Sequence, residues 1–449
     1  MSSPRARKWL LVLMGTLVVM AVLGVLVAEG QDSGDEPEKT RILIVGDSIS
    51  QGSAGDYTWR YRLWKHLRDT GVRFDFVGPR DDLYDNVSGT FGGHDYADPA
   101  FDQDHAARWG TTVAQARSLI RGQVTTYQPD VILVLLGTND LAWLKAGPDD
   151  VARGLRDLVR RARLARPDLG FVVGRVPEDG LPDAAELNAQ VEGLAASMST
   201  PESQVAVAST DAGFTEPGDT WQPFHPNARG ELKIAAAMAD ALSTLGVGSP
   251  YPRPLPGVPL GPRTAPVLTA AAGDGEAALS WSAAPGATDY YVWMRDVTAG
   301  EPWKRLPYPV TGTSWPASGL ENGHKYAFRL QPEKGRWASA DVRSNIVTVT
   351  PEPAMPGPVP SVMAVPSGSG ATLSWTPADK ATGYYVWQRD ASAQAEWSRL
   401  PGPLASTSFT VEGLVGGSTY EYAVQPTNDG VDGPRSDSVA VVAGAAPVG

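Results

Sequence analysis

Three short polar clusters in this chain hold residue types that together could hydrolyse an ester. They lie at residues 46–48 (GDS), 137–140 (GTND) and 225–227 (HPN). A serine hydroxyl is a weak nucleophile that needs a neighbouring base, and Ser48 could find that base in the imidazole of His225. The oxyanion that then develops needs N–H donors, which the side chain of Asn139 and the backbone of Gly110 and Ser48 could supply. These residues therefore predict acyl transfer through a serine nucleophile.

The elements that would position these clusters alternate between strands and helices from residue 40 to 247. Apolar, β-branched runs predict strands, and apolar residues at helical spacing predict helices. The predicted strands are 41–46, 73–77, 130–136, 170–173 and 204–208, and the predicted helices are 57–70, 112–121, 148–165, 183–198 and 228–245. This order predicts an α/β fold of about five parallel strands with helices on both faces, whose ligand site lies at the carboxyl ends of the strands. Residues 78–110 show no period and predict a long functional loop.

The composition excludes several kinds of chemistry. The chain has 449 residues and a net charge of −12, and it contains five histidines and no cysteine. This length corresponds to roughly three domains, and the negative charge argues against a nucleic-acid surface. The lack of cysteine excludes a thiol nucleophile, a disulfide and cysteine-bound zinc. Among the other histidines, His66 lies between basic residues of a predicted helix and is expected to face solvent, whereas His105 is a candidate for substrate contact.

Residues 1–29 predict an export signal. Arg5, Arg7 and Lys8 precede an uncharged run over residues 9–28, and an acidic linker follows at residues 30–39. As a helix, the uncharged run would span about 28 to 30 Å, close to the thickness of the hydrocarbon core of a bilayer. It therefore predicts either a cleaved signal peptide or an uncleaved membrane anchor. Both alternatives place the rest of the chain outside the cell, either secreted or anchored to the membrane.

Residues 40–247 resemble the SGNH, or GDSL-type, hydrolase superfamily, whose four motif blocks occur here in order. Ser48 in GDS matches the nucleophile block, and Gly110 in the Trp-Gly pair matches the glycine block. Asn139 in GTND matches the asparagine block, and His225 in HPN matches the histidine block. The resemblance implies a flavodoxin-like three-layer αβα sandwich that hydrolyses esters without a metal or a cofactor. The G-x-S-x-G signature of α/β-hydrolases is absent at residues 46–50.

One position departs from the pattern of that superfamily. Its members usually carry an aspartate three residues before the histidine, and this chain has Gln222 there. Loss of the carboxylate in a related triad costs on the order of ten-thousandfold in rate. One interpretation is a dyad of Ser48 and His225 in which Gln222 or a backbone carbonyl orients the ring. A second has Asp219, or else Asp211, replacing the carboxylate, and a third is a weakened enzyme or a domain that only binds its ligand.

The composition changes after the predicted hydrolase domain. Residues 248–264 are rich in proline and predict a semi-rigid linker. Two copies of one module follow at residues 265–351 and 356–445, with a period of about 94 residues. The segment ALSWSAAPGATDYYVWMRD of the first copy recurs as TLSWTPADKATGYYVWQRD in the second. The period and the short alternating strands predict two small β-sandwiches.

The two modules resemble fibronectin type III domains. Trp281 and Trp375 match the core tryptophan of that family, while Tyr326 and Tyr420 match its tyrosine corner. The modules are either spacers or binding modules for glycan or protein. In the second case they would bind through exposed aromatic side chains, because such rings can stack on sugars. The candidates for this role are Trp293, Trp303, Trp387 and Trp397.

We therefore expect an exported serine esterase followed by two fibronectin-like modules. In the expected mechanism, His225 takes the proton of Ser48, and Ser48 attacks the ester carbonyl to form an acyl-enzyme that water hydrolyses. By analogy, the modules favour an acetyl or other short-chain ester on a polysaccharide as the substrate. The alternatives are a catalytically weak or inactive glycan-binding adhesion protein on the same scaffold, and a lipid esterase.

Overall fold

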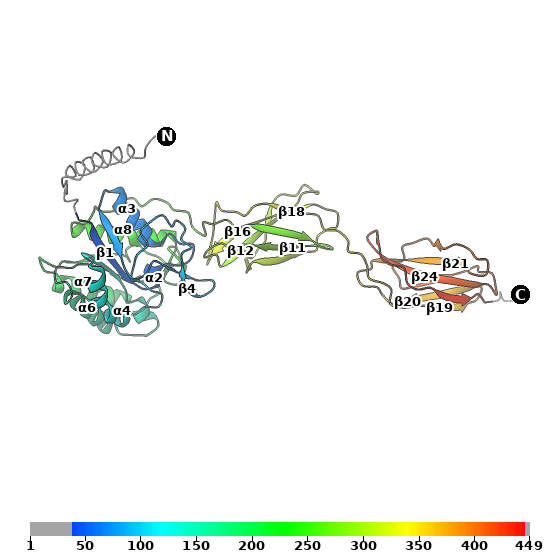
Figure 1. Ribbon diagram of the computed structural model, residues 1–449, viewed down its shortest axis with the longest axis horizontal. Helices are drawn as coiled ribbons and strands as arrows, with labels where there is room; N and C mark the ends of the chain where they lie inside the picture. The colour runs from blue at the N-terminus through cyan, green and yellow to red at the C-terminus, as the bar shows by residue number, and fades with distance from the viewer. Residues whose placement is uncertain (1–37, 445–449) are drawn as a thin grey trace, which may run out of the picture.

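Three bodies follow one another along the chain in the computed structural model, which describes residues 38–444 (Figure 1). An α/β domain comes first, and two β-sandwiches extend from it in a row. The predicted export signal at residues 1–29 lies outside the described residues. Within residues 38–444, no helix is both long enough and apolar enough to cross a membrane. Export and anchoring therefore stay predictions.

The α/β domain is built on one parallel sheet of five strands. In spatial order the strands are β2 (Phe74–Val77), β1 (Thr40–Gly46), β5 (Val131–Leu135), β6 (Gly170–Gly174) and β7 (Val205–Ala208). These are the five strands that the sequence predicts. Every residue of β5 is buried, because helices cover both faces of a parallel sheet.

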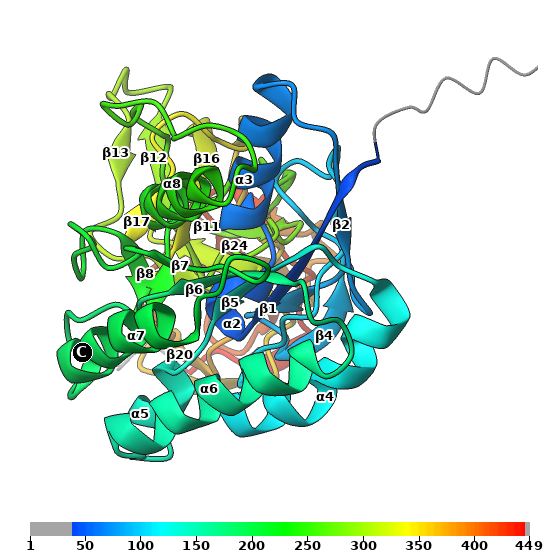
Figure 2. The ribbon, with the colours of Figure 1, turned by 90° about the vertical axis from the view of Figure 1, so that its left-hand side faces the viewer.

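Helices on both faces of this sheet complete the predicted three-layer sandwich (Figure 2). Helices α3 (Thr58–Asp69) and α8 (Ala228–Thr244) cover one face, and α4 (Val113–Tyr127), α6 (Pro148–Arg163) and α7 (Ala184–Met198) cover the other. Successive side chains of a strand point to opposite faces. Ile44 therefore packs in the core beneath α3 and α8, whereas Val45 packs in the core beneath α4 and α6.

The strand order places the polar clusters next to each other. The chain runs from β1 outward to β2 and then crosses back past β1 to β5, so the order reverses between β1 and β5. Open α/β sheets bind ligands at such a reversal, outside the carboxyl ends of the strands. Gly46 at the end of β1 pairs with Leu135 at the end of β5. The clusters that follow these two strands therefore lie side by side.

Several short elements occur where the sequence pattern predicts none. They are α2 (Ser48–Gln51), α5 (Thr138–Ala142), β3 (Leu83–Asp85), β4 (Thr90–Gly93), β8 (Thr220–Gln222) and β9 (His225–Pro226). Such segments are too short to show a hydrophobic period. Strands β3 and β4 form a hairpin inside the loop predicted for residues 78–110. Helix α4 continues past its predicted end at residue 121 to Tyr127, because Val124 still packs in the core.

The two β-sandwiches confirm the predicted repeat. The strands of the first are β10 (Leu268–Ala272), β11 (Glu276–Trp281) and β15 (Ser314–Ser318) in one sheet, and β12 (Asp289–Asp296), β13 (Lys304–Arg305), β14 (Val310–Thr311), β16 (Tyr326–Lys334), β17 (Trp337–Ala338) and β18 (Val347–Val349) in the other. Those of the second are β19 (Val362–Ser367), β20 (Gly370–Trp375) and β23 (Ser408–Val411), facing β21 (Gly383–Asp390), β22 (Ser398–Arg399), β24 (Thr419–Asn428), β25 (Val431–Asp432) and β26 (Val439–Val442). Trp281 and Trp375 are buried in the two cores. The hydroxyl of Tyr326 accepts the backbone N–H of Glu321 at 3.0 Å, as a tyrosine corner requires.

The aromatic candidates for ligand binding are half-buried in the sandwiches. The guanidinium of Arg329 lies 5.1 Å from the ring centre of Trp293 and 4.4 Å from that of Trp303. In the second module an arginine from another position, Arg435, lies 4.6 Å from the ring centre of Trp387 and 5.9 Å from that of Trp397. Alternating arginine and aromatic side chains attract one another through cation–π contacts. These four rings thus pack against arginines, and a ligand-binding role for them stays a prediction.

The predicted linker at residues 248–264 contains no helix or strand and begins against the α/β domain. The ring of Tyr251 stacks on that of His66 with the centres 4.6 Å apart, and Nε2 of His66 lies 2.8 Å from the carbonyl oxygen of Ser249. The prediction that His66 faces solvent is therefore wrong. The side chain lies in the last turn of α3, where the linker folds back and covers it.

Candidate active site

Ser48 lies at the sharp turn between β1 and α2. A side chain on Gly46 would collide with that of Ser50, so the first residue of the GDS motif must be glycine. The carboxylate of Asp47 accepts the N–H of Ile49 at 3.0 Å and thereby caps α2. The turn holds Ser48 at the carboxyl end of β1, where the residue is 5 % exposed.

Asp47 is a buried acid next to the candidate nucleophile. Burial raises the pKa of its carboxyl to about 7; the hydrogen bond from Ile49 opposes this rise, and the charge of Asp140 adds to it. Asp140 accepts the N–H of Val113 at 3.1 Å, and burial raises its pKa as well. Both carboxyls thus accept backbone N–H groups and hold the turns that carry Ser48 and its neighbours.

The three predicted oxyanion donors come from three adjacent segments. The side-chain amide of Asn139, directly after β5, donates to the carbonyl of Thr111 at 3.0 Å and lies 3.5 Å from the carboxylate of Asp47. It therefore bridges the turn that carries Ser48 and the turn that carries Gly110. Gly110 has a φ of +79°, a conformation that other residues rarely adopt. The N–H groups of Ser48 and Gly110 have no acceptor within residues 38–444, so both are available to an oxyanion.

His225 faces the serine turn from the β8–β9 ladder. Its Nδ1 lies 3.0 Å from the carbonyl oxygen of Pro223 and 2.9 Å from the side-chain amide nitrogen of Gln222. Its Nε2 is buried and has no hydrogen-bond partner among the residues that the structure describes. Ser48 and His225 line the same small pocket. Because buried polar atoms normally have partners, the open Nε2 is a position where a substrate or hydroxyl proton can be accepted.

The contacts at Nδ1 fix the tautomer of His225. The carbonyl of Pro223 can only accept, so Nδ1 carries the proton and Nε2 keeps a free lone pair. Gln222 fits this tautomer when its amide is turned so that the oxygen faces Nδ1, which leaves the heavy-atom positions unchanged. Burial lowers the pKa of His225 to about 4; the bond to Pro223 opposes this change, and the charge of Lys334 adds to it. The ring is therefore neutral at neutral pH, as a general base must be.

The two aspartates considered as substitutes for the missing carboxylate have other partners. Asp219 forms an ion pair with Lys233 at 2.7 Å, and Asp211 forms one with Arg175 at 2.8 Å. Neither of them donates to or accepts from His225 in the structure. The geometry favours the dyad interpretation, in which a side-chain amide and a backbone carbonyl orient the ring.

Aromatic rings cover the imidazole. Trp109 stacks on His225 with the ring centres 4.3 Å apart and the planes 6° apart, and Tyr84 stacks on Trp109 with the centres 4.3 Å apart. The backbone N–H of Trp109 donates to the side-chain oxygen of Gln51 at 2.7 Å. Because Gln51 is the last residue of α2, the helix that begins at Ser48 also fixes the turn that carries the glycine donor.

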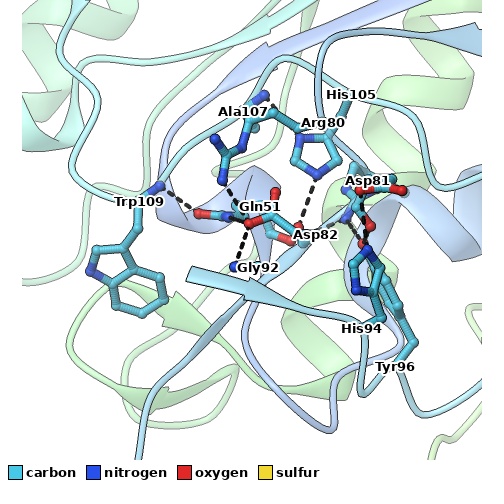
Figure 3. Close-up of polar contacts among 11 residues, drawn as sticks. Gln51, Arg80, Asp81, Asp82, Gly92, His94, Tyr96, His105, Ala107 and Trp109 are labelled. Carbon is cyan, nitrogen blue, oxygen red and sulfur yellow. Dashed lines mark hydrogen bonds and ion pairs between the residues drawn. The ribbon is translucent and has the colours of Figure 1, made fainter. Parts of the chain in front are cut away.

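A buried polar network extends from Gln51, the last residue of α2 (Figure 3). The Nε2 of Gln51 donates to the carboxylate of Asp82 at 3.2 Å. Asp82 also accepts from Arg80 at 2.6 Å and from the backbone N–H of Gly92 at 2.9 Å. No motif in the sequence points to Gln51, Asp82 or Tyr84 as residues of the site. The one local signal was that Gln51 follows the serine motif by three residues, which places it on the same short helix.

His105 belongs to this network and not to the substrate surface. It is fully buried, its Nδ1 accepts the N–H of Ala107 at 3.1 Å, and its Nε2 lies 3.0 Å from the carbonyl oxygen of Asp82. Burial lowers the pKa of His105 well below its usual range, so the ring is neutral. The prediction that His105 contacts substrate is wrong, because its side chain points into the domain and bonds to backbone on both sides (Figure 3).

An open groove of about 590 Å³ begins beside Trp109 and Gly110. Its walls combine aromatic and polar side chains. They include Phe91, Arg108, Gln115, Ser118 and Gln123. The guanidinium of Arg108 lies 4.7 Å from the ring centre of Phe91, so a flat cation and a flat ring line one wall. The groove therefore suits a ligand that has both polar groups and apolar faces.

Two family models match the chain. The model of the GDSL-like Lipase/Acylhydrolase family matches residues 44–232, and the model of the fibronectin type III domain matches residues 356–442. A solved carbohydrate esterase family 3 from Talaromyces cellulolyticus is 27% identical over 46% of this chain and 97% of its own, with a TM-score of 0.40. A family 3 carbohydrate esterase from Clostridium thermocellum is 24% identical over 46% of this chain and 97% of its own, with a TM-score of 0.39. A two-domain fibronectin type III segment of chicken tenascin is 18% identical over 40% of this chain and 99% of its own, with a TM-score of 0.29.

Proposed function

We propose that this chain uses Ser48 as the nucleophile and His225 as the base of ester hydrolysis. Its residues 44–232 are a domain of the GDSL-like lipase/acylhydrolase family, which makes the chain a carboxylic ester hydrolase. The observation that carries the proposal is the open Nε2 of His225. This nitrogen is buried in the pocket that Ser48 also lines and has no partner among residues 38–444, while Nδ1 is held by the carbonyl of Pro223. A histidine held in this way accepts a proton from only one side.

The proposed reaction passes through an acyl-enzyme. Nε2 of His225 takes the hydroxyl proton of Ser48 as Oγ attacks the ester carbonyl carbon, and the carbonyl oxygen becomes an oxyanion. The backbone N–H groups of Ser48 and Gly110 donate to that oxyanion. The side-chain amide of Asn139 keeps its bond to the carbonyl of Thr111 and turns its second N–H, which makes only the long 3.5 Å contact with Asp47, to the oxyanion. The imidazolium then returns the proton to the departing alcohol. Water repeats the sequence on the acyl-enzyme and releases the acid together with free Ser48.

The proposed substrate is a short-chain acyl ester, such as an acetyl ester, of a polysaccharide. The pocket at Ser48 is about 10 Å³ and leaves no room for a long acyl chain, which favours a short acyl group. The groove beside Gly110 suits a sugar chain, because sugars present hydroxyls at their edges and apolar faces that stack on aromatic rings. The long acyl chain of a lipid would need a broadly apolar channel, whereas polar side chains such as Arg108, Gln115 and Gln123 interrupt the apolar walls of this groove.

We also propose that the esterase acts outside the cell. The basic residues Arg5, Arg7 and Lys8 followed by the uncharged run at residues 9–28 support export by a signal peptide or a membrane anchor. Sequencing the N-terminus of the exported protein distinguishes the two, because cleavage would remove this run. Accumulation of the intact chain inside the cell would contradict the proposal.

Release of acid from matched esters tests the proposed substrate. The full chain should release acetate from a chemically acetylated polysaccharide and should hydrolyse p-nitrophenyl acetate much faster than p-nitrophenyl palmitate. Ser48→Ala is the control and should be inactive on all three while keeping the thermal unfolding of the wild type. Faster hydrolysis of the palmitate would favour a lipid esterase, and turnover that survives in Ser48→Ala would contradict the proposed nucleophile.

A further inference from the structure

The first β-sandwich inserts a lysine into the α/β domain. Lys334, the last residue of β16, is 5 % exposed. Its Nζ donates to the hydroxyl of Ser53 at 2.6 Å, to the carbonyl of Ala54 at 3.0 Å and to the carboxylate of Asp56 at 2.6 Å. All three donors of the ammonium group are therefore used. Because a buried charge is tolerated only when it is paired and hydrogen-bonded, this contact specifies how the two domains meet.

The turn that follows Lys334 contacts β8, which pairs with the histidine-bearing strand β9. Nζ of Lys334 lies 4.8 Å from the ring centre of Trp221, and the indole N–H of Trp337 donates to the carbonyl of Thr220 at 2.6 Å. A side chain on Gly335, whose φ is +61°, would collide with the carbonyl of Trp221. The turn of the sandwich is thus seated directly on β8.

The second sandwich uses the same turn for docking. Tyr326 is the first residue of β16, and the equivalent Tyr420 is the second residue of β24. In this register Lys334 at the end of β16 corresponds to Asn428 at the end of β24. The side chain of Asn428 donates to the carboxylate of Asp274 in the first sandwich at 2.8 Å. Each sandwich therefore places this residue against the part of the chain before it. In the first sandwich, which follows the hydrolase domain, the residue at this position is a lysine.

We propose that Lys334 is a positioning residue of the esterase site, so that the first fibronectin module is part of the catalytic unit. This inference rests on the proposed function. Lys334 joins two segments, the loop at residues 53–56 that follows the serine helix and the strand that contains Trp221. Both segments line the pocket that Ser48 and His225 share. Holding them together fixes the approach of the serine to the histidine, and misplacement by about 1 Å can cost about 100-fold in rate.

The charges around this pocket give the proposal a pH signature. Asp56 and Glu231 line this pocket, and Lys334 and Arg263 line the adjoining one. Arg62 forms an ion pair with Glu231 at 3.0 Å. Burial is the main cause that lowers the pKa of His225, and the positive charge of Lys334 is the second cause that lowers it. Removing that charge should raise the pKa of His225, so that the imidazole becomes protonated at a higher pH.

Lys334→Met in the full chain tests this role, because methionine keeps an unbranched side chain and removes the charge. We expect kcat/KM for p-nitrophenyl acetate to fall about 10- to 100-fold, and the acid limb of its pH profile to move to higher pH. Lys334→Arg keeps the charge and should restore the acid limb of the wild type. The matched control Asn428→Ala, at the same register position of the second sandwich, should change neither quantity.

A titration of the His225 ring by NMR separates this inference from the proposed function. If the wild type does not hydrolyse esters at all, the proposed function fails, and a rise in the pKa of His225 in Lys334→Met would still support the coupling of the two domains. An unchanged pKa together with unchanged turnover would overturn the inference. Loss of turnover with an unmoved acid limb and no rescue by Lys334→Arg would also overturn it, because only a general structural role would remain.

A second variant covers the case in which Lys334→Met does not fold. Asp56→Asn removes the ion pair but keeps the lysine and the shape of the side chain. Thermal unfolding shows whether each variant is folded at the assay temperature. A folded Asp56→Asn variant with reduced kcat/KM would support the positioning role, and one with wild-type kcat/KM would overturn it.

Discussion

Replacing Gln222 by glutamate would restore a carboxylate at the histidine. The side-chain nitrogen of Gln222 lies 2.9 Å from Nδ1 of His225, so an isosteric carboxylate would face the same ring atom. Opposite unit charges about 4 Å apart attract by about 4 kcal/mol at an effective dielectric constant of about 20. One pKa unit corresponds to about 1.36 kcal/mol, so this attraction would raise the pKa of His225 by about 3 units. From its value of about 4 in this chain, the pKa would rise to about 7.

The pH dependence of kcat/KM measures this change. The base acts only when it is neutral, so activity falls as the pH drops through the pKa of His225. The acid limb of the wild type is expected near the pKa of about 4, and that of Gln222→Glu is expected at a pH higher by about 3. At pH values above its acid limb, Gln222→Glu should have a higher kcat/KM than the wild type, by at most about 1000-fold. The reason is that about 4 kcal/mol of imidazolium stabilisation would lower the barrier.

Gln222→Met is the matched control, since it has a similar length and no charge. The carbonyl of Pro223 still holds Nδ1 in this variant, so the acid limb should stay close to that of the wild type. Initial rates of p-nitrophenyl acetate hydrolysis across the pH range give all three profiles. An unmoved acid limb in a folded Gln222→Glu variant would refute the reasoning, because residue 222 would then not face the histidine in the working enzyme.

Two further predictions concern the serine turn. Asn139→Ala should lower kcat about 100- to 1000-fold with little change in KM, because one oxyanion donor is lost, and a wild-type kcat would contradict its proposed role. Asp47→Asn should raise the thermal unfolding temperature more at about pH 8 than at about pH 5. The folded pKa of Asp47 is raised from 3.8 to about 7, so the native state holds an extra proton between these values and loses stability as the pH rises through them. Equal effects at both pH values would contradict this account of the buried carboxyl.

The sheet and the motif residues could be predicted because their signals are local. The apolar runs that become β1 and β5 are buried on both faces, so their strand character is written in consecutive residues. The polar clusters follow these strands directly. Once the strands are parallel, Ser48 and Asn139 must lie at one edge of the sheet.

The rest of the site depends on contacts between residues far apart in the sequence. His105 looks like an exposed loop histidine until the chain brings Arg80 and Asp82 against it. His66 likewise looks solvated until the linker returns to cover it. The contact of Lys334 with Asp56 spans two domains, and a basic residue at the end of a sandwich strand carries no sequence signal of its partner. Long-range polar pairs of this kind have no periodic pattern that a sequence alone could reveal.

Labelling by a fluorophosphonate tests the central claim most directly. The full chain is incubated with the reagent, and the modified peptide is identified by mass spectrometry. We expect one adduct, on Ser48, that is absent in Ser48→Ala and forms far more slowly in His225→Ala, because the hydroxyl reacts only when Nε2 of the histidine accepts its proton. An unlabelled Ser48 in the folded wild type, or labelling at the same rate in His225→Ala, would contradict the account.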